Sequence, residues 1–125
     1  MEFNKHKITL AVLVMLTLHT FAQKVNWVSI EEAVRLNEKE PRNILIDVYT
    51  DWCGYCKKMD RETYENKVIV GLINKNFYAV KFNAEQRDSV VFKGKTFGFI
   101  NQGRRGVHEF AAALLKGKMS YPSTV

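Results

Sequence analysis

The sequence has no internal repeat, no low-complexity segment and no linker rich in proline or glycine. Its 125 residues include only two prolines and seven glycines, and the composition is otherwise ordinary for a globular protein. A chain of this length can bury a modest hydrophobic core. We therefore expect one globular domain.

Cysteine and histidine, the usual zinc ligands, are also scarce. The cysteines are Cys53 and Cys56, and the histidines are His6, His19 and His108. A structural zinc site needs about four ligands, which these few residues are poorly suited to supply. We expect neither a metal nor another cofactor.

The charge is basic, but no nucleic-acid motif accompanies it. The formal net charge is +6, and basic proteins can bind nucleic acid, anionic membranes or acidic partners. The basic residues that come nearest to forming a cluster lie in the second half of the chain. They are Lys93, Lys95, Arg104, Arg105, Lys116 and Lys118. A solvated basic surface is the favoured interpretation, and we expect no nucleic-acid partner.

Residues 1–22 have the pattern of a secretory signal peptide. Lys5 and Lys7 precede an apolar run from Ile8 to Leu18, and a small residue, Ala22, suits cleavage. The run is shorter than the roughly 20 residues of a transmembrane helix. We expect cleavage after Ala22, no stable membrane insertion afterwards, and a mature protein in the periplasm or otherwise secreted. An uncleaved anchor is the alternative.

The two cysteines form a Cys-x-x-Cys pair where a predicted strand meets a predicted helix. Ile44–Tyr49 is apolar and rich in β-branched residues, which predicts a buried parallel strand. Lys57–Glu62 has no glycine, proline or β-branched residue, which predicts a helix. A helix N-terminus stabilises the reactive thiolate, so we expect Cys53 to attack a disulfide and Cys56 to resolve it. Half of a zinc site and a purely structural disulfide are the alternatives.

The segment from Ile44 to Lys57 resembles the active-site segment of the thioredoxin superfamily, since it combines Trp-Cys-Gly-Tyr-Cys-Lys with an acidic residue six positions before the first cysteine. It is most similar to the secreted bacterial thioredoxin-like proteins. The resemblance implies an α/β thioredoxin-like fold over residues 23–125, with a central mixed sheet flanked by helices. Thioredoxin has proline where this chain has Tyr55 and Arg61. The direction of electron flow therefore cannot be carried over from thioredoxin.

Asp47 and Lys81 are each the only charge within an apolar segment predicted to be a strand. Burying either charge alone costs several kcal/mol or forces it neutral, and an ion pair between neighbouring strands would relieve this. The resemblance implies the same pairing and implies that Asp47 moves protons to and from Cys56. An exposed Asp47 at a strand end, or an ion pair with a structural role only, are the alternatives.

Three aromatic or proline residues are candidates for substrate binding. Trp52 places a flat side chain beside Cys53, where it could shield the thiol and contact a bound peptide, unless it is ordinary packing. Tyr121-Pro122 resembles the cis-proline loop that faces the cysteines in this superfamily. The resemblance implies pairing of this loop with an extended substrate segment, whereas a trans-proline at a strand start is the alternative.

Apolar spacing predicts the other elements, which are a helix from Ser29 to about Glu38, an active-site helix reaching about Glu65, a helical segment over Val68–Ile73, a strand over Phe77–Phe82, a hairpin over Val90–Phe97 and an amphipathic helix over Val107–Leu115. Ser29 begins its helix in a capping box with Glu32. The hairpin is an insertion relative to thioredoxin.

These features predict a thiol–disulfide oxidoreductase that uses Cys53 and Cys56 on cysteine-containing proteins outside the cytoplasm. In an oxidising compartment a reductase needs electrons from a membrane-linked thiol–disulfide partner, and an oxidase needs a quinone-linked one. Asp47 and the Trp-Cys-Gly sequence resemble the reducing branch and favour a reductase. The alternative is a peptide-binding, chaperone-like module with an incidental cysteine pair.

The position of the last residue predicts a missing C-terminal part. In the thioredoxin fold, the proline loop leads into a strand, an antiparallel edge strand and a final helix. Val125 follows Pro122 by only three residues. We therefore expect a truncated copy of a protein of about 150–170 residues, with one sheet edge open.

Overall fold

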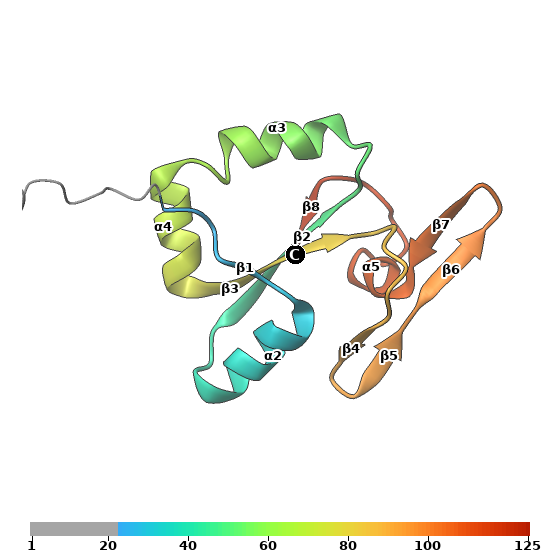
Figure 1. The fold of residues 1–125 in the computed structure, drawn as a ribbon, viewed down its shortest axis with the longest axis horizontal. Helices are drawn as coiled ribbons and strands as arrows, with labels where there is room; N and C mark the ends of the chain where they lie inside the picture. The colour runs from blue at the N-terminus through green and yellow to red at the C-terminus, as the bar shows by residue number, and fades with distance from the viewer. Residues whose placement is uncertain (1–22) are drawn as a thin grey trace, which may run out of the picture.

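The computed structural model describes residues 23–125 as a mixed β-sheet with helices on both faces and two small hairpins beside it (Figure 1). The predicted fold class is confirmed. The predicted signal peptide, residues 1–22, lies outside the described residues. Between residues 23 and 125, no helix combines the length and the apolar character needed to cross a bilayer.

The sheet has four strands in the order β1-β3-β2-β8. Its members are β1 (Trp27–Val28), β2 (Asn43–Tyr49), β3 (Phe77–Asn83) and β8 (Ser123–Thr124). β1 and β2 run parallel to β3, and β8 runs antiparallel to β2. β2 therefore lies inside the sheet, which accounts for its nearly continuous apolar sequence.

Four helices surround the sheet, namely α2 (Ile30–Lys39), α3 (Gly54–Glu62), α4 (Lys67–Asn76) and α5 (Glu109–Leu114). Ser29 caps α2 by accepting the backbone N–H of Glu32 at 3.1 Å. The Glu32 carboxylate pairs with Arg35 instead. Of the two hydrogen bonds of the predicted capping box, only the one that Ser29 accepts is therefore present. α3 ends three residues earlier than the sequence predicted.

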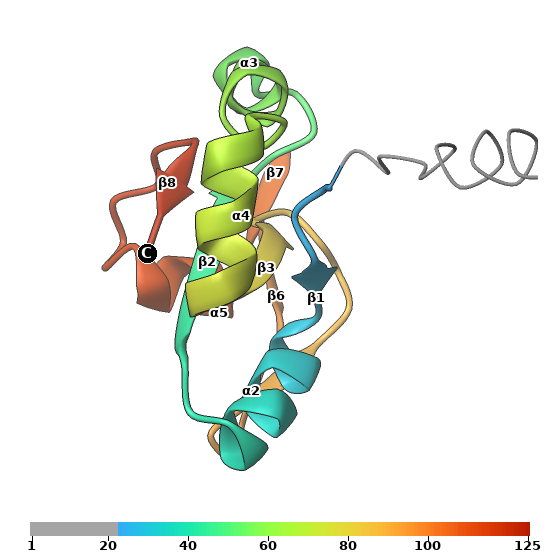
Figure 2. The ribbon, with the colours of Figure 1, turned by 90° about the vertical axis from the view of Figure 1, so that its left-hand side faces the viewer.

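The two faces of the sheet have separate cores. On one face, Ile46 and Val48 of β2 pack with residues of α2, α5 and the hairpin over Val90–Phe97. On the other face, Ala79 of β3 packs with Val70 and Ile73 of α4. Figure 2 shows α4 lying along this face. Asp47 alternates with Ile46 and Val48, so its side chain is on the face covered by α3 and α4.

Two hairpins connect β3 to α5. The predicted hairpin is present as β4 (Val90–Phe92) and β5 (Lys95–Phe97), which turn at Lys93 and Gly94. A second hairpin, β6 (Phe99–Gln102) and β7 (Arg105–His108), was not predicted. The prediction of a helix from Val107 is wrong, because Val107 pairs with Ile100 in this hairpin and α5 begins at Glu109.

Candidate active site

The cysteine pair caps the helix that follows β2. Cys53 and Cys56 form a disulfide with their Cα atoms 5.3 Å apart. Cys53 is the N-cap of α3, and its sulfur accepts the backbone N–H of Cys56 at 3.1 Å. This position confirms the predicted strand-to-helix junction and places Cys53 Sγ against a backbone donor at the helix end.

Both cysteines are nearly covered in this disulfide form. Cys53 is 5% exposed and Cys56 is 3% exposed, so burial hardly distinguishes the two cysteines. The space beside Gly54, between the two cysteines, is open, because a Cβ there would meet nothing within 4 Å.

Asp47 and Lys81 lie side by side, as the sequence predicted. They are register partners in β2 and β3, and Lys81 Nζ lies 3.1 Å from Asp47 Oδ2. Burial raises the pKa of the Asp47 carboxyl, although the Lys81 ammonium opposes that rise. The second oxygen, Asp47 Oδ1, is buried and has no hydrogen-bond partner among the described residues. That oxygen is available to take or give a proton.

Asp60 is a third member of this charged group, which the sequence reasoning missed. Its carboxylate also bonds Lys81 Nζ. Burial alone would lower the pKa of Lys81, but Asp60 and Asp47 together raise it. Asp60 stands four residues after Cys56, about one helical turn, and this spacing was the available signal.

Aromatic rings surround the Lys81 ammonium. The ring centres of Trp27, Tyr49 and Tyr64 lie 5.2, 5.2 and 5.3 Å from Nζ, which is cation–π distance. A cleft of about 240 Å³ opens beside it and is lined by Lys24, Val25, Trp27, Asp60, Tyr64, Glu65 and Lys81. Asp47, Lys81 and Asp60 thus form a continuous ionic chain from the sheet interior to this cleft.

Trp52 is exposed and is held by contacts from three directions. The side chain is 56% exposed, and its indole N–H donates to Glu85 Oε1 at 3.0 Å. The ring of Tyr121 meets it edge-on at 6.0 Å, and the Arg105 guanidinium lies 5.2 Å from its ring centre. Ordinary core packing is therefore excluded for Trp52. Glu85 and Arg105 are contacts that the sequence reasoning did not foresee.

The Tyr121–Pro122 peptide bond is cis, as predicted. The two residues form one wall of a groove of about 320 Å³, which is also lined by Tyr55, Lys58, Met59, Glu62 and Thr63 of the α3 region. Burial and the nearby Glu85 raise the pKa of the Tyr121 hydroxyl. The groove lies against α3, the helix that begins at the disulfide.

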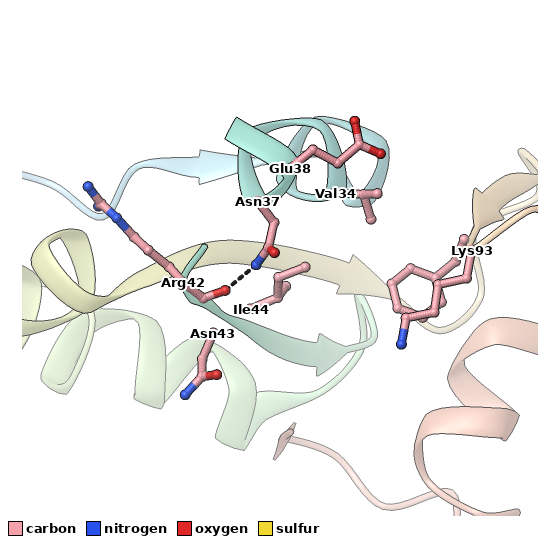
Figure 3. A pocket seen from close by; sticks show the side chains of 8 residues that line it. Val34, Asn37, Glu38, Arg42, Asn43, Ile44 and Lys93 are labelled. Carbon is pink, nitrogen blue, oxygen red and sulfur yellow. Dashed lines mark hydrogen bonds between the residues drawn. The ribbon is translucent and has the colours of Figure 1, made fainter. Parts of the chain in front are cut away.

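A third pocket, apart from the cleft beside Lys81 and the groove beside Tyr121, lies at the opposite end of β2 (Figure 3). It measures about 330 Å³, and its walls include Val34, Ile44 and Phe92. The Asn37 amide that faces it donates to the Arg42 carbonyl (Figure 3). Throughout residues 23–125, no three His, Cys, Asp or Glu side chains gather to hold a metal ion.

Comparisons with known proteins show what this chain is similar to. A protein-family model described as thioredoxin-like matches residues 26–107. Spermatogenesis-associated protein 20 of Rattus norvegicus and that of Mus musculus are each 33% identical over 60 residues, which cover 48% of this chain and 8% of each relative. The solution structure of a thioredoxin from Thermus thermophilus aligns with a TM-score of 0.48 at 13% identity, over 76% of this chain and 91% of that one.

Proposed function

Because this chain belongs to the thioredoxin-like family, we propose that it is a thiol–disulfide oxidoreductase that reduces disulfides in cysteine-containing proteins outside the cytoplasm. The observation that carries the proposal is the Cys53–Cys56 disulfide at the N-terminus of α3, directly after the strand that holds the buried Asp47. A metal role for the cysteines has no support among the described residues.

The reaction begins with both cysteines as thiols. Cys53 loses its proton to solvent, and the resulting thiolate attacks one sulfur of a substrate disulfide, so that a Cys53–substrate bond forms and the second substrate sulfur leaves as a thiolate and takes a proton. Cys56 then loses its proton and attacks Cys53 Sγ, which forms the Cys53–Cys56 disulfide and releases the first substrate sulfur, also as a thiol after protonation. Two electrons pass from the protein to the substrate.

Asp47 is the proposed proton acceptor for Cys56. Its unpartnered oxygen is buried, and burial raises its pKa, which makes it a stronger base than an exposed aspartate. Lys81 and Asp60 link it to the open cleft. The proton can then pass to water, and no unpaired charge remains buried in the sheet.

Substrate would lie in the groove between α3 and the Tyr121–Pro122 loop. The groove offers Tyr55, Met59 and Tyr121 as apolar or aromatic contacts. Extended peptides bind such grooves through backbone pairing and side-chain contacts. This arrangement supports a protein substrate rather than a small thiol.

The cellular setting that we propose rests on the sequence. The pattern of residues 1–22 supports export, cleavage after Ala22 and a location in the periplasm or outside the cell. A reductase in that oxidising compartment must be re-reduced, and we propose a membrane-linked dithiol protein as the electron donor. The same pattern supports a released protein without stable membrane insertion.

Insulin reduction with dithiothreitol as the terminal reductant tests the function. We expect the protein to accelerate the precipitation of insulin chains and Cys53→Ser to abolish that acceleration. Retained peptide binding with no acceleration by the unaltered protein would instead favour a chaperone-like binding module. The reduction potential of the Cys53–Cys56 pair then decides between reductase and oxidase. Comparing it with the redox potential of the compartment gives the direction of electron flow.

A further inference from the structure

The hairpin of β6 and β7 has no part in the proposed chemistry, yet it carries an exposed basic tip. Residues from Asn101 to Arg105 are exposed. Arg104 and Arg105 form no salt bridge with any carboxylate of residues 23–125. The tip therefore presents cationic groups that are free to bind an anionic partner.

The hairpin has a defined position because its base is fixed. The Phe99 ring crosses the pair of strands at Gly106, and the Arg87 guanidinium lies 4.7 Å from the centre of that ring. His108 donates its backbone N–H to Ala84 O at 2.8 Å, which ties β7 to the segment after β3. A hairpin anchored in this way can present its tip in one orientation.

The tip also reaches the redox site. Arg105 covers the ring of Trp52, the residue next to Cys53. Trp52 in turn meets Tyr121, which lines the groove beside α3. Figure 1 shows the hairpin projecting on the side of the molecule where β2 ends and α3 begins. One continuous surface thus runs from the groove, past the disulfide, to the arginines.

Two carboxylates lie near this surface, but neither pairs with the arginines. Glu85 accepts the Trp52 indole N–H, and Asp51 accepts the Asn83 amide at 3.1 Å. Both donors are neutral, so the two carboxylates keep their negative charge. Lys57, in the first turn of α3, is exposed and adds a further cation beside the cysteines. An incoming carboxylate therefore meets Arg104 and Arg105 without a competing ion pair among residues 23–125, and arginine binds carboxylates with two parallel hydrogen bonds.

We propose that the β6–β7 hairpin selects substrates, with Arg104 and Arg105 binding acidic side chains that flank the reactive cysteine of the substrate. This inference rests on the proposed function, because it concerns the same disulfide. A protein segment fits better than a membrane surface, since polybasic membrane sites gather about 4–8 cations and this tip has two arginines. The groove beside Tyr121 also requires a chain that continues past the cysteine.

Single-turnover kinetics with matched peptides tests the selection. The reduced protein is mixed with oxidised peptides that share one disulfide and differ only in acidic or basic flanking residues, and Trp52 fluorescence reports the reaction. We expect the acidic peptide to react faster by about three- to tenfold at low salt. The preference should shrink as salt screens the charges.

Two double variants locate the effect. Arg104→Glu with Arg105→Glu should abolish or reverse the preference. Lys93→Glu with Lys95→Glu makes the same charge change on the other hairpin and should leave the preference intact. Arg104→Gln with Arg105→Gln removes the charge with little change in size. It replaces the glutamate variant in the experiment if circular dichroism shows that the glutamate variant does not fold.

The outcomes separate the inference from the function. Equal rates for both peptides with the unaltered protein, or an unchanged preference in the arginine variants, would overturn the selection role while the reductase stands. Loss of binding to phosphatidylglycerol vesicles in the arginine variants, with peptide selectivity unaltered, would assign the tip to membranes and overturn it as well. Failure of the unaltered protein to reduce either peptide would overturn the proposed function itself.

Discussion

Asp47 and Lys81 face each other across the two central strands, with Lys81 Nζ 3.1 Å from Asp47 Oδ2 and Asp47 only 1% exposed. The two members of this ion pair differ in their further partners. Lys81 has a second carboxylate partner in Asp60, whereas one oxygen of Asp47 has no partner among residues 23–125. Removing Asp47 therefore leaves Lys81 paired, but removing Lys81 would leave Asp47 buried and alone.

Asp47→Asn should stabilise the fold at neutral pH. The folded-state pKa of Asp47 is raised by burial, so the folded protein binds this proton more tightly than the unfolded chain does. The resulting stability is present below the unfolded pKa and is lost as pH rises through the folded pKa. We expect the variant to gain about 1–2 kcal/mol in free energy of unfolding above that pKa, and less in acid.

Urea denaturation of both proteins across a pH series measures this difference. Asp51→Asn, which removes an exposed carboxylate of the same segment, is the matched control and should show no such pH-dependent gain. A stability difference for Asp47→Asn that is the same at all pH values would contradict the linkage to its pKa.

Asp60→Asn should lower the pH at which disulfide exchange accelerates. The Asp60 charge raises the pKa of Asp47, and Asp60 also competes with Asp47 for Lys81. Both effects disappear in the variant, so the pKa of Asp47 should fall and the carboxylate should form at lower pH. The rate of the resolving step, measured against pH with a mixed disulfide on Cys53, reports the midpoint.

Glu65→Gln is the control for that experiment, because Glu65 lines the same cleft but does not bond Lys81. Its midpoint should match that of the unaltered protein. A midpoint that moves equally in both variants would mean that the cleft acts only through its overall charge.

The fold was largely predictable because local signals agreed with the final packing. The apolar run around Asp47 predicted a buried strand, and the isolated charges Asp47 and Lys81 predicted their own pairing. The β6–β7 hairpin was missed because its sequence is polar and its register depends on Phe99 crossing at Gly106, a contact between strands that no local pattern reveals. Val107 fitted the helical spacing of α5 by coincidence.

The position of the cysteines between a strand and a helix was predictable from the composition of the flanking segments, whereas their surroundings were not. Asp60 and Arg105 are ordinary charged residues in sequence, and only the packing of α3 on β3 and of the hairpin on Trp52 brings them to the site.

The reduced protein should show unequal thiols despite the similar burial of the two cysteines. Cys53 Sγ lies at the helix end against a backbone N–H, so its pKa in the dithiol form should fall below the free value of about 8.5. We expect iodoacetamide to label Cys53 faster than Cys56 near neutral pH, as read by mass spectrometry. Faster labelling of Cys56 would reverse the proposed roles of the two cysteines.

Gly106→Ala should disrupt the hairpin and leave the redox chemistry intact. A Cβ at this position would lie 2.0 Å from Phe99 Cζ and 2.6 Å from the Ile100 carbonyl oxygen, so both the ring and the backbone must move. Overpacking of this kind costs about 1–3 kcal/mol, and displacement of Phe99 also loosens its contact with Arg87. Reduction of a peptide without charged flanks should keep its rate, while the preference for acidic flanks should fall. Gly71→Ala, in α4, is the control, because its Cβ would meet nothing within 4 Å, and it should retain the preference for acidic flanks. Loss of both activities in Gly106→Ala, with native circular dichroism, would mean that the hairpin supports the cysteines themselves rather than the choice of substrate.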